Sequence, residues 1–351
     1  MIEIDGSEGE GGGQIVRSSL ALSLLTGKPF TIRNVRAGRK KPGLMRQHLT
    51  AVNAAAEIGG AHVEGANVGS REITFQPGEI RYGDFDFRIS TAGSVTLVLQ
   101  TVLPALMVGE TASKITLSGG THNMMAPPFD FLARSFVPQL EKMGPRVQLQ
   151  LNAWGFYPAG GGQFIADVTP AQSLKSLNLT ERGELVAKRV RAVVSALPRK
   201  IAERETARVV RKLQWNDAKV EHVEVENPVG PGNILFAELV YENVTTVFTG
   251  FGRMGVSAES VADQVVRDVR NYRRFDAPVG PHLADQLMLP MAIAAHTSSV
   301  DGKFRTVPLT QHSMTQAGII QRFMDVEIAI EQEDGGDARG AVLVSIAGRA
   351  V

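Results

Sequence analysis

The chain has 351 residues, 43% of them hydrophobic, and its 37 basic and 36 acidic residues leave a net charge of +1. This length exceeds one compact core, so we expect two domains, and the balanced charge argues against a protein that binds nucleic acid over its whole surface but leaves room for a local basic cleft. The absence of cysteine excludes disulfides and thiolate sites, and the absence of a leader pattern or of a run of roughly 18 apolar residues predicts a cytoplasmic protein that does not enter membranes.

A glycine-rich stretch, E-G-E-G-G-G-Q-I-V-R over residues 8–17, opens the first helical pattern, which Gly27 ends. A glycine loop that leads into a helix near Gln14 exposes backbone amides at the positive end of the helix dipole, and these favour an anion. We therefore predict a phosphate site, with Arg17 about one turn into the helix. The carboxylate of Glu10 is explained if a divalent cation joins it to the phosphate. The stretch is neither a Walker loop nor a dinucleotide fingerprint.

A basic turn, R-A-G-R-K-K-P-G-L-M-R-Q-H-L over residues 36–49, follows an expected strand over residues 30–35. Its glycines and proline predict a loop. The simplest interpretation of its charges is a solvated loop, but the nearby phosphate site favours a second set of anion contacts. The basic residues are Arg36, Arg39, Lys40, Lys41 and Arg46.

A unit of helix, tight turn and strand recurs three times along the chain. The pairs of helix and strand that we expect are residues 49–58 with 62–64, 136–143 with 147–151, and 315–323 with 326–330. The G-G-G-Q-I-V motif at residues 11–16 also has an echo in G-G-G-Q-F-I at residues 160–165. Repeated units of this kind predict an α/β (α+β) fold in which helices pack together under several sheets.

Two segments lie between the second and third units. We expect residues 90–107 to form a largely apolar helix that carries Gln100, and residues 118–131 read S-G-G-T-H-N-M-M-A-P-P-F-D-F. His122 is a possible ligand, although a lone histidine in a polar loop is more often hydrated. The two prolines fix an extended segment that we expect to form a pocket wall.

A change of composition marks residues 183–275, which are richer in charge. The patterns predict the order βαβββα, with a hairpin that turns at residues 242–243 and a closing helix over residues 258–274. The earlier type of unit resumes afterwards, so we expect an inserted small α/β domain within a large domain made of residues 1–182 and 276–351. We interpret its helical basic residues mainly as a solvated face.

One late histidine, His312, lies where an extended segment meets a helix start, in T-V-P-L-T-Q-H-S-M-T-Q over residues 306–316. Imidazole is mostly neutral near pH 7 and is an apt nucleophile toward phosphorus. The position of one histidine does not by itself identify a catalytic nucleophile.

Several motifs together, in this order, resemble the RNA 3′-terminal phosphate cyclases. The resemblance covers essentially the whole chain and includes the glycine stretch, R-A-G-R-x-K-P-G-L-x-R-Q-H-L, S-G-G-T-x-N with A-P-P, F-Y-P-A-G-G-G, H-L-A-D-Q-L and the late histidine. It implies a large domain of three repeated βαβαββ units similar to the enolpyruvyl transferases, with a smaller inserted thioredoxin-like domain.

The resemblance also implies a reaction. In the family, ATP drives the conversion of an RNA 3′-phosphate into a 2′,3′-cyclic phosphate, through a covalent histidine adenylate, an adenylated RNA end and a divalent metal (Mg²⁺ or Mn²⁺). By this resemblance His312 is the nucleophile, Arg17 and Arg39 are catalytic, and Glu10 is the metal ligand. Phosphate or substrate contacts are implied for Arg36, Arg39 and Gln47, and nucleotide contacts for Gln100, Pro127, Phe251, His282, Asp285 and Gln286.

Two positions depart from the family pattern. Gln316 stands where the family often has asparagine, which puts the orientation of His312 in question, and His282 stands where an aromatic residue is more common, which puts adenine stacking in question. Two alternatives remain open: a cyclase-like protein of the ribosome-assembly type that binds RNA without adenylylation, and an enolpyruvyl transferase. The sequence leaves the physiological RNA, the preferred metal and the oligomeric state open.

Overall fold

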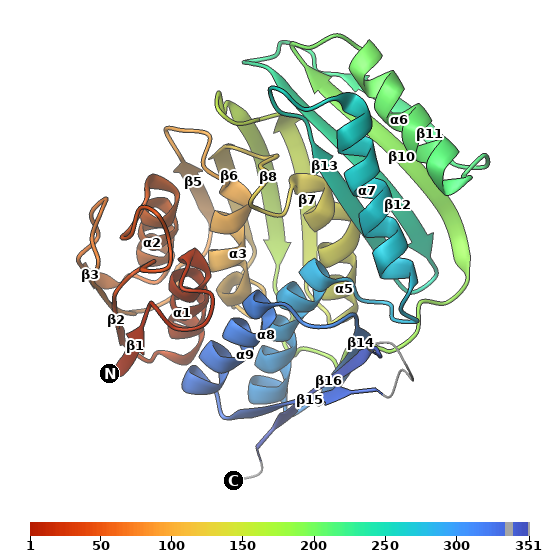
Figure 1. Cartoon of the computed structure of the whole chain (residues 1–351). Helices are drawn as coiled ribbons and strands as arrows, with labels where there is room; N and C mark the ends of the chain where they lie inside the picture. The colour runs from red at the N-terminus through yellow and green to blue at the C-terminus, as the bar shows by residue number, and fades with distance from the viewer. Residues whose placement is uncertain (334–339, 350–351) are drawn as a thin grey trace.

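The architecture is mixed α/β, as the sequence predicts. The structure is a computed structural model that describes residues 1–333 and 340–349, and four four-stranded sheets are present in that part of the chain (Figure 1). No helix among the described residues has the length and apolar character needed to cross a membrane.

The first sheet is formed by the N-terminal residues. Its strands lie in the order β1-β2-β4-β3, with β1 parallel to β2 and the other neighbours antiparallel. The bounds are β1 Ile2–Asp5, α1 Gly13–Thr26, β2 Phe30–Arg33, α2 Arg46–Ile58, β3 His62–Glu64 and β4 Ile73–Gln76.

Two further sheets repeat this strand order and these directions. The second has the order β5-β6-β8-β7 and the third β9-β14-β16-β15, each with one parallel and two antiparallel pairs. The second unit contains β5 Asp84–Arg88, α3 Val95–Leu106, β6 Ser113–Gly119, α4 Phe129–Phe131, the π-helical turn η1 Leu132–Phe136, α5 Val137–Lys142, β7 Arg146–Ala153 and β8 Gly162–Thr169. The third contains β9 Asn178–Leu179, α8 Pro281–Ser298, β14 Gly302–Thr306, α9 Gln311–Phe323, β15 Val326–Gln332 and β16 Val342–Gly348.

The fourth sheet lies between β9 and α8 in the sequence. Its order is β11-β10-β12-β13, and its two helices pack on each other through the ion pairs Arg204–Glu259 and Arg208–Asp263. Its own apolar cluster includes Trp215. The bounds are β10 Leu185–Ser195, α6 Lys200–Leu213, β11 Lys219–Glu224, β12 Gly232–Tyr241, β13 Thr245–Phe251 and α7 Ala258–Arg273.

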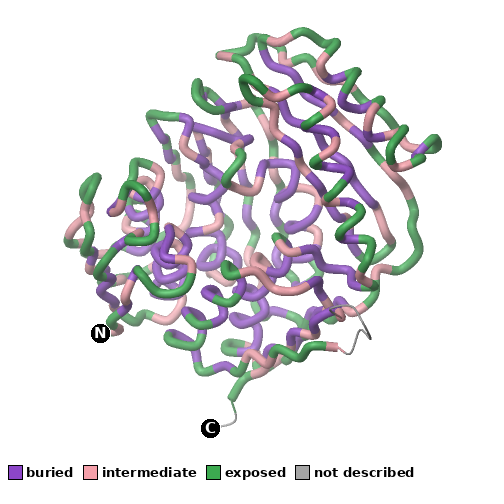
Figure 2. Tube along the Cα trace, viewed as in Figure 1, coloured by how far each residue is buried: buried purple, intermediate pink, exposed green. Residues whose placement is uncertain are grey.

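The central helices α1, α3 and α8 are buried on most sides (Figure 2), whereas α9 buries one face and exposes the other. Helix α1 contacts α2, α3 and α9, and α8 contacts α9. Because a largely buried helix needs few charges, most polar positions of α1 are serine and glutamine, including Gln14 and Ser18, and its one charged residue is Arg17. These central helices bring residues from both ends of the chain into contact.

Several expected boundaries were wrong at helix starts. Helix α2 begins at Arg46 instead of 49, α3 at Val95 instead of 90, and α9 at Gln311 instead of 315. At α9 the reason is the cap, because the Thr310 hydroxyl accepts a hydrogen bond of 3.3 Å from the Ser313 amide. His312 consequently lies in the first helical turn.

Two local interpretations were also wrong. His122 is not hydrated but buried, with 1% exposure, between the Thr121 hydroxyl and the Asp130 carboxylate. The second G-G-G-Q motif is not an equivalent of the first, because residues from Gly162 form strand β8 whereas those from Gly13 form α1. In both cases distant packing partners decide the outcome.

Gly27 and Gly318 offer a matched test of backbone conformation. Gly27 ends α1 with a φ of 67°, Gly318 lies inside α9, and a Cβ at either position would meet no atom within 4 Å. Gly27→Ala should lower the free energy of unfolding by about 1 kcal/mol, because an L residue is strained in the left-handed region. Gly318→Ala should raise it by about 0.5 to 1 kcal/mol through helix propensity. Chemical denaturation measures both, and a stabilising Gly27→Ala would contradict this account.

Candidate active site

The candidate site lies where the N-termini of several helices meet. The Glu10 amide, just before α1, donates a 3.0 Å hydrogen bond to the Thr315 hydroxyl of α9. The Ser94 amide at the start of α3 donates to the Gln47 side-chain oxygen of α2, at 3.2 Å. Each of these N-termini carries unpaired amides and a partial positive charge, so their meeting favours an anionic ligand.

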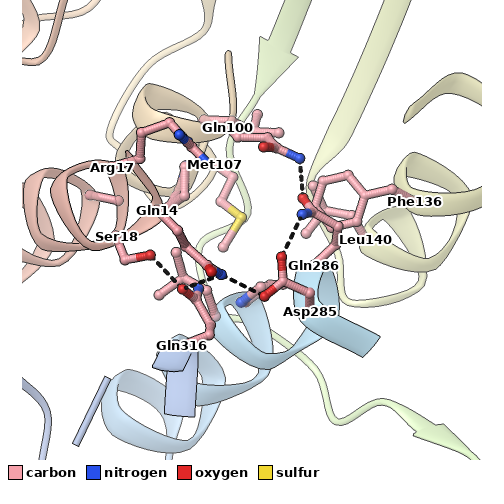
Figure 3. Close-up of a pocket in the computed structure, with 15 residues that line it drawn as sticks. Gln14, Arg17, Ser18, Gln100, Met107, Phe136, Leu140, Asp285, Gln286 and Gln316 are labelled. Atoms are coloured by element: carbon pink, nitrogen blue, oxygen red, sulfur yellow. Dashed lines mark hydrogen bonds between the residues drawn. The ribbon is translucent and has the colours of Figure 1, made fainter. Parts of the chain in front are cut away.

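The Gln14 side chain connects three helices (Figure 3). Its amide nitrogen donates to Asp285 Oδ1 at 2.6 Å and to Gln316 Oε1 at 3.3 Å, while its oxygen lies 2.7 Å from His312 Nδ1. Ser18 also donates to Gln316. The half-buried Asp285 carboxylate fixes which way the Gln14 amide points, because a carboxylate accepts and an amide nitrogen donates.

This amide sets the tautomer of His312. The Gln14 oxygen is an acceptor only, so His312 Nδ1 must carry the ring proton and Nε2 holds a lone pair. Burial lowers the pKa of His312; Arg17 and Arg39 lower it further, whereas Asp285 opposes them. The ring is therefore neutral near pH 7, with Nε2 available to attack.

Two arginines from the predicted set lie beside this imidazole. Burial lowers the pKa of Arg17 to about 10, with Asp285 opposing the shift, so the guanidinium stays charged near pH 7. Arg39 pairs with Glu10, whose Oε1 lies 3.6 Å from His312 Nε2. Arg17, Arg39, Glu10 and His312, which span 302 residues of sequence, are thus brought together.

The other two predicted phosphate residues are engaged elsewhere. Arg36 donates through Nη1 to the Lys41 and Gly43 carbonyl oxygens, at 2.9 and 2.7 Å, so this guanidinium group closes its own loop. The Gln47 oxygen caps α3.

A small cleft lies next to the Gln14 network. It contains Gln100, Asp285 and Gln286, which the sequence predicted as nucleotide contacts, together with Arg17 and Gln316. Gln100 donates to Gln286, which in turn donates to Asp285 at 3.3 Å (Figure 3). Apolar side chains close the far side: Leu103, Pro104, Met107, Phe136, Leu140, Leu289 and Pro290.

A larger cleft, of about 540 Å³, opens one turn earlier on α8. His282 lines it, and Phe131 from α4 and Phe248 from β13 belong to its aromatic wall. Sequence reasoning missed both phenylalanines, although Phe131 closes the A-P-P-F-D-F motif. Phe251 and Pro127 line neither cleft, and the Pro127 carbonyl oxygen accepts a hydrogen bond from Thr96.

Buried charges join the fourth sheet to the helical segment that carries Phe131. Asp130 accepts from His122 at 2.9 Å and from Arg191 of β10, and Arg134 forms a 2.9 Å ion pair with Glu238 of β12. The Arg191 guanidinium lies over the Phe236 ring, 4.8 Å from its centroid. This network fixes the segment on which one wall of the larger cleft is built.

Glu10 is the candidate metal ligand. Its Oε2 is buried without a hydrogen-bond partner, and a Cβ at Gly12 would lie 2.6 Å from Oε1, so a larger residue at position 12 would displace this carboxylate. Within the described residues no group of three or more His, Cys, Asp or Glu could hold a metal ion. One free carboxylate oxygen fits Mg²⁺, which takes one or two carboxylates and completes its shell with phosphate oxygens and water.

An oriented, neutral imidazole nitrogen beside two guanidinium groups defines a site suited to nucleophilic attack at phosphorus. A family model described as RNA 3′-terminal phosphate cyclase matches residues 8–330, and the chain belongs to that family. Two relatives carry the name "RNA 3′-terminal phosphate cyclase". The relative from Koribacter versatilis (strain Ellin345) is 48% identical over 95% of this chain and 93% of its own. That from Ectopseudomonas mendocina (strain ymp) is 46% identical over 95% of each. The family predicted from the sequence is confirmed.

His48 beside the site should make stability depend on pH. Burial lowers the pKa of His48 to about 3, and Arg17, Arg36 and Arg39 add to the shift. As the pH falls below about 6.5, His48 binds a proton in the unfolded chain but not in the folded chain. The free energy of unfolding should therefore fall by up to about 1.4 kcal/mol per pH unit.

Urea denaturation of wild type and His48→Gln at about pH 7.5 and pH 5.5 measures the effect. Between the higher and the lower pH, we expect the free energy of unfolding to fall by about 1 kcal/mol less in the variant than in wild type. The difference between the two proteins at the higher pH measures any destabilisation by the substitution itself. Equal losses in the two proteins would show that His48 is protonated in the folded state.

Proposed function

We propose that the protein uses ATP to convert an RNA 3′-terminal phosphate into a 2′,3′-cyclic phosphate through a covalent adenylate on His312. The observation that supports this most directly is the chain of hydrogen bonds from Asp285 through Gln14 to His312, which leaves Nε2 with a free lone pair. Family membership supports the overall reaction.

The first step would join His312 Nε2 to the α-phosphorus of ATP. The bond to the bridging oxygen breaks and pyrophosphate leaves, while the Nδ1 proton stays in its hydrogen bond to Gln14. Arg17 and Arg39 would neutralise charge that develops on the phosphate oxygens. A divalent cation held by Glu10 would supply further positive charge at the phosphates.

Two steps would complete the reaction. An oxygen of the RNA 3′-phosphate attacks the phosphorus of the adenylate, which releases His312 and forms a phosphoanhydride. The neighbouring 2′-OH then attacks the RNA phosphorus, AMP leaves, and the hydroxyl proton passes to solvent. The 2′-OH is already next to the phosphorus, so the last step depends mainly on positioning.

We further propose that the two clefts share the nucleotide. Gln100, Asp285 and Gln286 would bind its polar part, and the aromatic wall of the larger cleft, with His282, would take the base. The shared helix α8 supports this division, since His282 and Asp285 lie three residues apart on it.

The domain organisation is part of the proposal. Residues 183–275 would be a thioredoxin-like domain inserted into a large domain of residues 1–182 and 276–351, whose three βαβαββ units are similar to those of the enolpyruvyl transferases. The equal strand orders of three sheets and the separate apolar cluster of the fourth support it. A cytoplasmic location also remains a prediction.

The decisive test is adenylylation of His312. Wild type mixed with α-labelled ATP and Mg²⁺ should gain one AMP through a linkage that is labile to acid and stable to base, as a phosphoramidate is. His312→Asn should lose the label and the cyclisation of RNA 3′-phosphate, yet still cyclise RNA with a preformed 3′-adenylate anhydride. A label on lysine would contradict this mechanism. A wild type without AMP uptake would favour the non-catalytic, RNA-binding alternative.

A pair of phenylalanines on β13 tests the base site. Phe248→Ala should raise the KM for ATP about 5- to 150-fold, the equivalent of about 1 to 3 kcal/mol for a lost stacking contact. Phe251→Ala should change it little, since Phe251 lies outside both clefts. The sequence-based hypothesis expects the large effect at Phe251, so the order of the two KM values decides between them.

A further inference from the structure

Two loops emerge side by side from a buried support above the α3 N-terminus. The amides of Thr121 and His122 both donate to the Gly155 carbonyl oxygen at 3.0 Å, and His122 forms a parallel bridge with Phe156. Because the bridge is parallel, the chain leaves it in the same direction on both sides. Residues 123–126 and 157–161 therefore lie next to each other.

These loops, with a third over residues 226–231, expose apolar side chains that we call the rim patch. Its members are Met124, Met125, Tyr157 and Val229, exposed by 48%, 84%, 77% and 63%. Val229 closes the patch against the second loop, since a Cβ at Gly161 would lie 2.7 Å from it. The three loops contain one acidic residue, Glu226.

The support beneath the rim patch is rigid. His122 stacks on Trp154, with 4.4 Å between ring centroids, and contacts the tilted ring of Phe156 at 5.6 Å. The same imidazole is bound to the buried Asp130. Tyr157 thus follows directly after a buried aromatic residue and projects from a fixed base, which limits the entropy lost when a ligand stacks on its ring.

The rim patch is connected to the candidate active site. The Asn123 side chain donates to the Ala92 carbonyl oxygen at 2.7 Å, and two residues later Ser94 is bound by Gln47 at the start of α2. Lys40, Lys41 and Arg46 are exposed next to this start, and the described residues contain no ion pair of these three. The segment from Asn123 through Ser94 to Gln47 thus links two surface features. An exposed tyrosine lies at one end of it, and positive charges without ion pairs lie at the other.

We propose that this surface binds the single-stranded RNA just upstream of its 3′ end. Unstacked bases would pack on Tyr157 and the two methionines, and Lys40, Lys41 and Arg46 would contact backbone phosphates. Aromatic stacking is tolerant of sequence and basic contacts are independent of it, so the surface fits an enzyme that recognises RNA ends. The inference rests on the proposed function for its ligand, but needs no catalysis to be measured.

The test measures binding of a fluorescent 12-nucleotide RNA with a 3′-hydroxyl to the full chain. Tyr157→Ala should raise the Kd about 5- to 150-fold, whereas Tyr157→Phe, which keeps the ring, should leave the Kd within about twofold of wild type. Arg46→Ala should lower the magnitude of the slope of log K against log salt concentration by about 0.7. Val186→Ala, at a position on β10 that is 65% exposed, serves as the surface control. Thermal unfolding of each variant verifies its fold.

The outcomes separate the two proposals. If the Kd of Tyr157→Ala equals that of wild type, the RNA assignment is wrong. It is also wrong if Tyr157→Ala weakens RNA binding no more than the control Val186→Ala does. If Tyr157→Ala binds RNA normally but no longer binds a protein partner that wild type retains, the patch is a protein interface and the inference is wrong. A wild type that binds RNA through Tyr157 yet never takes up AMP would sustain this surface and overturn the proposed catalytic function.

Discussion

One neutral side chain, the Gln14 amide, holds the candidate site together. It accepts from an imidazole near the C-terminus of the chain and donates to a carboxylate on a different helix. No charged group could replace it without adding a buried charge next to Asp285, whose pKa is already raised by burial. The packing of α1 against α9, together with the hydrogen bond from Gln14 to Asp285 of α8, thus also orients His312.

Much of the site could be predicted because its signals are local. A run of glycines before a helix predicts an anion site, and the order of several motifs along the chain identified the family. His312 was singled out by its polar neighbours and the expected helix start, and its role as nucleophile was implied by the family resemblance. The sequence could not show that Gln14 orients this histidine, because 298 residues separate the two. Nor did it show that Gln316, expected to disturb the orientation, accepts from Gln14 and Ser18.

The failures share one physical cause, which is that burial is decided by partners far away in sequence. His122 follows glycines and threonine in a polar loop, but the rings of Trp154, Phe156 and Phe236 pack around it. Phe248 and Phe251 are three residues apart on a strand, so their side chains point to opposite faces. The alternation of side chains along a strand does not by itself reveal which face of β13 meets the larger cleft. Each recurring pattern in the sequence spans only one helix and one strand, so it did not show the strand order that three of the sheets share.

The charges that join β10 and β12 to the segment around Asp130 have a mechanical consequence. Separating these parts would break the ion pairs of Asp130 and Glu238, which are exposed by 4% and 1%, and a hydrogen bond to a charged group contributes about 1.5 to 3 kcal/mol. Opening at this junction is therefore rare. We therefore expect the aromatic cleft to keep a nearly constant width, so that it would select ligands by their thickness.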